Sequence, residues 1–157
     1  MVDQRPGVIP RATATDPTLV VAGVVVDARG RVLAARRSYP ESLAGRWEFP
    51  GGKAAPDETP QQALVRELDE ELGIRALVGD EVVGPDHGHW PINEELTMRA
   101  YWCQSDDVAT HTGRDHDQLV WVGPQDLPAL AWLPADVALA ETVAHHLLHG
   151  PASARGL

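Results

Sequence analysis

Residues Gly51 to Ile74 read GGKAAPDETPQQALVRELDEELGI and combine a glycine pair with a segment of helical periodicity. Thr59 is a favourable N-cap, Pro60 suits the first helical position, and Gln62 completes a capping box. Gly73 is placed to end the helix. The apolar residues form one stripe at helical spacing: Ala63, Leu64, Leu68 and Leu72. The stretch therefore predicts a turn followed by an amphipathic helix.

The other side of this helix carries the glutamates Glu67, Glu70 and Glu71. At about 100° per residue they fall within a sector of roughly 60°. Like charges at this spacing repel each other, and the helix dipole disfavours negative charge near a C-terminus. Oxygen ligands that converge on one point suit Mg²⁺ or Mn²⁺ better than zinc. The two penalties suggest a divalent cation as a compensating ligand. On this spacing alone, however, a solvated acidic face on which Arg66 pairs with Glu70 is favoured, and only a longer motif reverses that preference.

The same stretch matches a longer motif, GX5EX7REUXEEXGU, in which U is apolar. Every specified position is matched, by Gly52, Glu58, Arg66, Glu67, Leu68, Glu70, Glu71, Gly73 and Ile74. The segment thus resembles the Nudix box, and agreement at so many fixed positions is highly specific. The resemblance implies the Nudix fold, an α/β/α sandwich with a central mixed β-sheet.

The resemblance also implies a reaction, the hydrolysis of a nucleoside diphosphate linked to another group, with Mg²⁺ or Mn²⁺ as the cofactor and water as the nucleophile. Metal ions are needed because a phosphate chain carries several negative charges, and they also activate water. Glu58 is expected to orient the metal site, and Arg66 to hold a glutamate by bidentate pairing. Glu67 and Glu70 are expected to be catalytic, Glu67 also as a candidate base. The implied metal ligands are the Gly51 carbonyl, Glu67, Glu70 and Glu71.

Three further residues are candidates around the box. Lys53 offers positive charge to a phosphate beside glycines that allow close backbone approach, unless it is a solvated lysine. Arg37 stands where MutT-type members of the family carry a phosphate-binding arginine, and an exposed arginine at a strand end is the alternative. Such members have an acidic residue, a metal ligand or base, six positions before a tryptophan, and Trp121 places it at Asp115. Its neighbours His116 and Asp117 could share this role, and a plain polar turn is the alternative for all three.

The chain most resembles the MutT-like branch, whose members remove unwanted nucleotides from the nucleotide pool. In MutT the residue after Pro-Ala near the last helix is an asparagine that reads an oxidised guanine, and here it is Asp136. An ionised aspartate only accepts hydrogen bonds, which favours an amino group such as cytosine N4. This version resembles CTP pyrophosphohydrolases, although 8-oxo-dGTP also offers donors. Alternatively, Asp136 only caps the last helix.

The remaining patterns predict an α/β arrangement of strands and helices. The apolar run Leu19 to Val26 is typical of a strand that is covered on both faces. We expect further strands at Val32 to Arg36, Trp47 to Phe49, Arg75 to Val83, Glu95 to Gln104 and Leu119 to Val122, a turn at Pro50 to Gly52, a loop at Gly84 to Glu94, and a second helix at Pro134 to His149.

Length and composition limit the remaining choices. With 157 residues, 43% of them hydrophobic, the chain predicts one domain, 18–150, with a flexible extension at 1–17 and a flexible tail at 151–157. The net charge of −10 argues against a nucleic acid polymer as partner. Cys103 is alone and expected to be a buried, inert thiol, which suits the cytoplasm. No apolar run is long enough to cross a membrane.

The expected protein is a monomer or homodimer that acts on a nucleotide. The leading hypothesis is a Mg²⁺-dependent nucleoside triphosphate pyrophosphohydrolase that releases a monophosphate and pyrophosphate. One alternative keeps this chemistry but acts on a nucleotide sugar or a dinucleotide, as ADP-ribose hydrolases do. Another is a Nudix module that senses a nucleotide without cleaving it, which the intact Glu67, Glu70 and Glu71 oppose.

Overall fold

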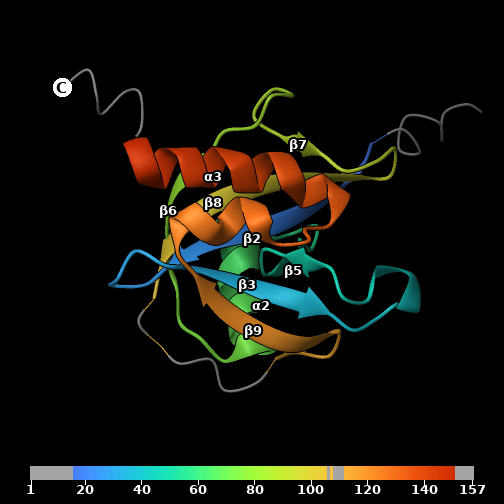
Figure 1. Ribbon diagram of the computed structural model, residues 1–157. Coiled ribbons are helices and arrows are strands. Elements are labelled where there is room, and N and C mark those ends of the chain that lie inside the picture. Colours follow the sequence, from blue (N-terminus) through green and yellow to red (C-terminus); the bar gives the residue numbers. More distant parts are fainter. Residues whose placement is uncertain (1–15, 106, 108–111, 151–157) are drawn as a thin grey trace, which may run out of the picture.

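The computed structural model describes residues 16–105, 107 and 112–150. Helices α2 (Pro60–Leu72) and α3 (Val137–His149) cover opposite faces of a β-sheet (Figure 1). This arrangement confirms the predicted α/β/α sandwich. The predictions for residues 1–15 and 151–157 lie outside the described residues.

Among the described residues the sheet has eight strands, in the order β4-β3-β2-β8-β6, with β5 and β9 attached to β2 and β3 and β7 attached to β8. The pairing of β2 with β8 is parallel and the other pairings are antiparallel, so the sheet is mixed, as predicted. The strands are β2 (Thr18–Val26), β3 (Val32–Arg37), β4 (Trp47–Glu48), β5 (Gly51–Lys53), β6 (Leu77–Val82), β7 (Trp90–Pro91), β8 (Leu96–Gln104) and β9 (His116–Val122). Short 3-10 helices lie at η1 (Glu41–Leu43), η2 (Pro124–Ala129) and η3 (Pro134–Asp136).

Strand β2 is the centre of the sheet and is buried on both faces, as its continuous apolar run predicts. Val21 and Val25 pack in the cluster that contains the apolar stripe of α2. Ala22 and Val24 point to the opposite face and pack in the cluster that contains α3. Alternate residues of a strand face opposite sides, so this one strand joins both cores.

Helix α2 begins and ends as the sequence predicts. The Thr59 hydroxyl accepts from the Gln62 backbone N–H at 3.1 Å, and the Gln62 side chain accepts from the Thr59 backbone N–H at 2.9 Å. Gly73 follows the helix with a φ of 69°, in the left-handed region that glycine adopts without strain. The capping box and this glycine fix both ends of the helix that carries the three glutamates.

Several boundaries differ from the predictions. The expected turn at Pro50 to Gly52 is largely strand β5, because backbone pairing with β2 continues through the glycines. The predicted loop at Gly84 to Glu94 contains the short strand β7, and β9 begins at His116, three residues before the predicted Leu119. The last helix is preceded by the separate turn η3, so α3 begins at Val137. Local pattern cannot reveal these pairings between distant segments.

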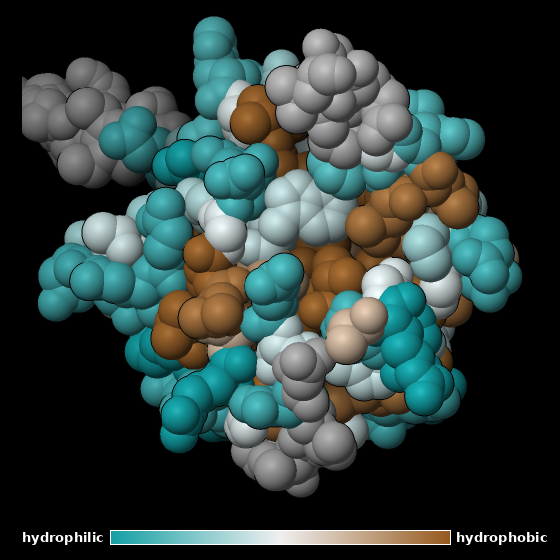
Figure 2. All heavy atoms as spheres, turned by 90° about the vertical axis from the view of Figure 1, so that its left-hand side faces the viewer, coloured by the Kyte–Doolittle hydropathy of each residue, from teal (hydrophilic) through white to brown (hydrophobic). Residues whose placement is uncertain are grey.

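The buried face of α3 is shorter than its apolar residues suggest. Leu139, Ala140, Val143 and Ala144 are buried, whereas Val137 and Leu148 remain 42% and 51% exposed. Figure 2 shows the side of the molecule at β6 and the C-terminal end of α3, where apolar side chains form separate groups among hydrophilic ones. Within the described residues, no helix has the length and apolarity needed to cross a membrane.

Candidate functional site

A cavity of about 710 Å³ receives side chains from both sides of the sheet. Glu67 and Glu71 reach it from α2, next to β5, and we call this part the α2 end. Glu48 of β4 and Asp136, directly before α3, line what we call the α3 end. The two ends therefore bring carboxylates from distant segments of the chain into one cavity.

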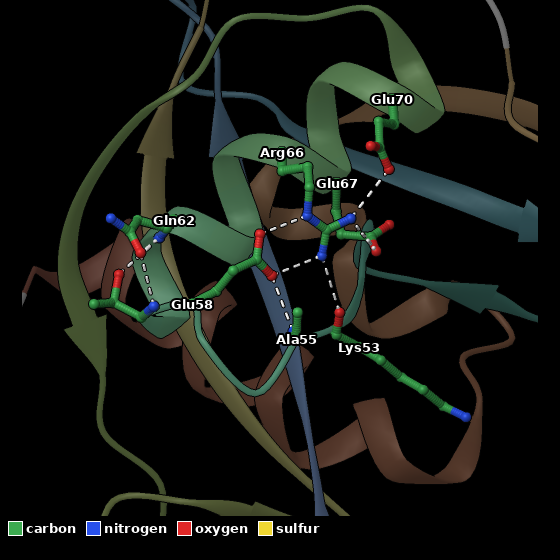
Figure 3. A network of polar contacts seen from close by, with 8 residues as sticks. Lys53, Ala55, Glu58, Gln62, Arg66, Glu67 and Glu70 are labelled. Atoms are coloured by element: carbon green, nitrogen blue, oxygen red, sulfur yellow. Dashed lines mark hydrogen bonds and ion pairs between the residues drawn. The ribbon is translucent and has the colours of Figure 1, made fainter.

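The Arg66 guanidinium organises the α2 end, as Figure 3 shows. It donates to both carboxylate oxygens of Glu58, at 2.6 and 2.9 Å, and to the Lys53 carbonyl at 3.2 Å. It also donates to Glu67 at 3.1 Å and to Glu70 at 3.0 Å. One side chain thus links strand β5 to the acidic face of helix α2. Its pairing with Glu58 is bidentate, which is the kind of pairing expected for Arg66.

Glu58 fastens the loop that precedes α2. Its carboxylate accepts from the Ala55 backbone N–H at 2.9 Å as well as from Arg66. The hydrogen bonds from Arg66, followed by that from Ala55, lower the pKa of Glu58 from 4.5 to about 2. Glu58 is therefore ionised at neutral pH, and its role in orienting a metal site stays a prediction.

Glu67 and Glu71 are the box glutamates that line the cavity. Burial raises the pKa of Glu67, the neighbouring Arg66 lowers it, and the charges of Glu71 and Glu70 raise it again. A side chain at Gly52 would overlap the Glu67 carboxylate. The cavity wall is thus closely packed around Glu67, and its acidic side chains outnumber its basic ones.

Glu70 lies differently from the other two glutamates. Its side chain is 57% exposed and bonds to Arg66, and it does not line the cavity. Among the described residues, no three Asp, Glu, His or Cys side chains already surround a metal position. The pairing of Arg66 with Glu70, weighed from the sequence as the alternative to a metal site, is therefore present in this arrangement.

The two glycines of β5 serve the packing of the protein itself. A side chain at Gly51 would overlap the Val21 carbonyl of the paired strand β2, and one at Gly52 would overlap Glu67. From the sequence we expected these glycines to admit a phosphate chain. In the structure, the space that side chains would occupy at these glycines is taken by the neighbouring strand and by a carboxylate. Lys53 is exposed, lines the cavity, and points its side chain away from the Arg66 network in Figure 3.

Arg37, at the end of β3, has every arm of its guanidinium engaged by protein groups. Nε and Nη2 donate to the Tyr39 carbonyl at 2.9 and 2.6 Å, and Nη1 donates to Glu48 at 2.8 Å. Its side chain is only 18% exposed, so it is not the exposed strand-end arginine weighed as an alternative. These bonds use three of the five guanidinium N–H groups, so one N–H each on Nη1 and Nη2 remains for a further acceptor such as a phosphate.

Asp115 lies 3.9 Å from the Arg37 guanidinium and lines the cavity. The next residue, His116, is part of strand β9 and is paired with Arg37. His116 also lines the cavity, and its Nε2 lies 2.6 Å from the Glu48 carboxylate. The plain polar turn weighed for this segment is therefore incorrect for His116.

Asp136 is 5% exposed, and its carboxylate accepts from the Phe49 backbone N–H at 3.0 Å. It stands at the N-cap position of α3 but makes no side-chain cap hydrogen bond, so the interpretation of Asp136 as only a helix cap is wrong. Burial and, to a smaller extent, the charge of Glu48 outweigh the hydrogen bond from the Phe49 N–H and together raise the pKa of Asp136 from 3.8 to about 7. Asp136 is therefore partly protonated near neutral pH, and not fully ionised as the sequence argument assumed.

Sequence reasoning missed most of the α3 end. Glu48 was hidden in a short strand, and the apolar lining residues Leu43, Ile92 and Met98 come from segments without a motif. Trp47, Trp90 and Trp132, whose rings are large enough to stack on a base, are not among the residues that line the cavity. Phe49 lines it instead, with its ring stacked on Trp132 at 4.6 Å. The sequence signal that was available was the adjacency of Glu48 and Phe49 to the glycine pair.

The donors at the α2 end fit a hard divalent cation. Glu67, Glu71 and the neighbouring Gly51 supply oxygen atoms only, which suits Mg²⁺ or Mn²⁺ rather than a thiolate-seeking metal. Glu70 would join them by turning away from Arg66. A bound cation supplies positive charge to a phosphate chain and activates water for attack on phosphorus. The α3 end, with the buried Asp136 and the partly buried Glu48 among apolar side chains, is suited to hold a flat polar group such as a base.

Comparison with known proteins is consistent with this site. A family model described as NUDIX domain matches residues 16–143. The CTP pyrophosphohydrolase of Escherichia coli (strain K12) is 37% identical over 121 residues, which cover 77% of this chain and 87% of that protein. The 8-oxo-dGTP diphosphatase of Haemophilus influenzae is 32% identical over 130 residues, which cover 83% of this chain and 90% of that protein.

Among solved structures, the solution structure of the E. coli ORF135 protein superposes with a TM-score of 0.71 at 34% identity. The superposition covers 89% of this chain and 97% of the other. A MutT structure reported for Aliivibrio salmonicida and Vibrio cholerae superposes with a TM-score of 0.62 at 26% identity, covering 81% and 95%. The arrangement of sheet and helices is therefore shared over nearly the whole of these proteins.

The raised pKa of Asp136 predicts a specific pH dependence of stability. The folded protein keeps a proton on Asp136 up to about pH 7, whereas the unfolded chain loses it near pH 3.8. The free energy of unfolding contributed by this group therefore falls as pH rises from about 4 to 7. Asparagine stays uncharged and still accepts from Phe49. We expect Asp136→Asn to gain about 2 kcal/mol relative to the wild type between pH 5 and pH 8 in urea unfolding. A difference that does not change with pH would contradict the assignment.

Proposed function

Because the chain belongs to the Nudix hydrolase family and its relatives are pyrophosphohydrolases that act on nucleotides, we propose that it hydrolyses cytidine triphosphates to the monophosphate and pyrophosphate in a Mg²⁺-dependent reaction. The observation that carries this proposal is the pair of acidic side chains, Glu48 and Asp136, at the α3 end of the cavity. The proposal has two parts, one for the phosphate chain and one for the base.

The phosphate chain is assigned to the α2 end. Its lining combines the carboxylates Glu67 and Glu71, expected to hold divalent cations, with the exposed Lys53. Glu67 has its pKa raised by burial, which brings it closer to the working pH of a general base. Asp115 also lines the cavity, directly before β9, and is the second candidate for an acidic catalytic group. The excess of carboxylates in the cavity lining would repel a polyphosphate, and this supports the proposed dependence on a divalent cation.

The base is assigned to the α3 end. One Asp136 oxygen is occupied by the Phe49 N–H, so its other oxygen remains for a ligand. Near neutral pH this oxygen is protonated in part of the molecules and can donate, while a Glu48 oxygen accepts. A donor beside an acceptor complements cytosine, which presents the acceptor N3 next to the N4 amino group. The guanine edge also presents an acceptor, O6, next to the donor N1–H, so 8-oxo-dGTP is the second candidate; cytidine is placed first because the relative that is 37% identical is a CTP pyrophosphohydrolase.

This activity would remove cytidine triphosphates, including damaged ones, from the nucleotide pool. The substrate is a free nucleotide, since the net charge of −10 opposes the binding of a nucleic acid polymer. We propose a cytoplasmic location, where such a pool exists, and a monomer or homodimer as the active form.

The proposal predicts a ranking among substrates. With Mg²⁺, we expect kcat/KM to be highest for dCTP or CTP, lower for 8-oxo-dGTP and dGTP, and lowest for ADP-ribose and a dinucleotide, with monophosphate and pyrophosphate as products. EDTA should abolish turnover. Asp136→Asn should change the ratio of dCTP to 8-oxo-dGTP turnover, because it fixes the donor and acceptor roles of that side chain. Fastest turnover of ADP-ribose would contradict the proposal.

The exposed position of Glu70 makes its assignment as a metal ligand testable. Loss of a metal ligand should cost well over ~1.4 kcal/mol in transition-state stabilisation, so we expect Glu70→Gln to lower kcat/KM more than tenfold. The matched control is Asp69→Asn, which removes one charge from the neighbouring exposed position of α2. If Glu70→Gln loses no more activity than Asp69→Asn, Glu70 only pairs with Arg66.

A further inference from the structure

His116 is a largely buried histidine at the start of β9. Its side chain is 10% exposed, and it reaches the cavity from the strand paired with the end of β3. Nε2 lies 2.6 Å from Oε2 of Glu48, whereas Nδ1 is buried with no hydrogen-bond partner among the described residues. A proton on Nδ1 would be an unsatisfied buried donor, so Nε2 carries the proton and donates it to Glu48.

The same oxygen of Glu48 receives a second donor. Arg37, the last residue of β3, donates from Nη1 to Oε2 at 2.8 Å. Within the described part of the chain, no hydrogen bond reaches the other oxygen, Oε1. The Glu48 side chain is 19% exposed and lines the cavity. Two donors therefore hold one oxygen of this carboxylate, and the other remains available to a ligand.

We propose that His116 is a positioning residue for the substrate base. Its Nε2–H, together with Arg37, fixes one oxygen of Glu48, so that the other oxygen accepts from an amino group of the base. This inference rests on the proposed function, because it gives Glu48 the acceptor role at the α3 end. It assigns His116 no proton transfer and no contact with phosphate, and it separates His116 from its neighbour Asp115, which faces Arg37 at 3.9 Å.

The hydrogen bond does not require a charged histidine, because Nε2–H is present in the neutral tautomer and in the imidazolium. What the position needs is a donor at the distance of Nε2. A glutamine side chain extends far enough to place its amide nitrogen near that point, whereas an asparagine amide is shorter and ends near the position of Nδ1. Both variants supply an amide N–H donor, but only glutamine places it near the position of Nε2. The comparison therefore tests whether the position of the donor matters.

The experiment compares pairs of triphosphates that differ by an amino or an oxo group on the base: dCTP with dUTP, and dATP with dITP. We expect the wild type to prefer the amino member of at least one pair. His116→Asn and His116→Ala should reduce this preference about fivefold or more, mainly through KM, because the donor to Glu48 is lost. His116→Gln should restore it. His145→Gln, the same exchange on the exposed face of α3, should leave it unchanged.

Each failure has a distinct meaning. A wild type without preference for an amino group overturns the proposed base reading, and the role of His116 with it. A wild-type preference that survives in His116→Asn overturns the role of His116 while the proposed substrate stands. Equal loss in the Asn and Gln variants, with kcat and KM changed alike, would show that His116 only supports the fold. Chemical-shift assignment of the His116 ring provides a check without substrate, since the inference requires a proton on Nε2 that Glu48→Gln perturbs.

Discussion

The Arg66 guanidinium is the interaction on which the site depends. The fold places Glu58, Glu67 and Glu70 within reach of one another, and carboxylates at such spacing repel. Arg66 bonds to all three and to the Lys53 carbonyl, so it joins the loop, strand β5 and helix α2 into one unit. Its planar fork suits this task, because a single point charge cannot serve several carboxylates in fixed directions. The resulting face is acidic and rigid at the place where cations are needed.

The two ends of the cavity use carboxylates in opposite ways. At the α2 end, negative charge is concentrated because one arginine, Arg66, faces several carboxylates, although burial raises the pKa of Glu67. At the α3 end, burial favours the protonated form of Asp136, while Arg37 and His116 keep Glu48 in an accepting role. In the proposed function, one end therefore binds metal ions and phosphate, and the other end binds the hydrogen-bonding groups of the base. Strand β2 contributes residues to both cores and so fixes the position of one end of the cavity relative to the other.

The sequence predicted the parts of the molecule that local chemistry determines. The capping box, the terminal Gly73 and the apolar stripe of α2 are encoded within neighbouring residues, and the structure has them as expected. The α3 end could not be predicted in the same way, because Glu48, His116 and Asp136 meet only after β3 has paired with β4 and β9. The protonation of Asp136 was misjudged for the same reason, since burial is a property of the packed fold. For Glu70, helical spacing correctly predicted the face it shares with Glu67 and Glu71. It could not predict that the side chain pairs with Arg66 and does not line the cavity.

The most direct test of this account is the Mg²⁺ affinity of Arg66→Lys, measured by titration calorimetry against the wild type. Lysine keeps the positive charge and removes the fork, so electrostatics alone predicts little change. If Arg66 positions the carboxylates through its directed hydrogen bonds, Mg²⁺ binding should weaken by about tenfold or more while α2 stays folded by circular dichroism. An unchanged Mg²⁺ affinity in the folded variant would contradict the account, because the acidic face would then be held in place without Arg66.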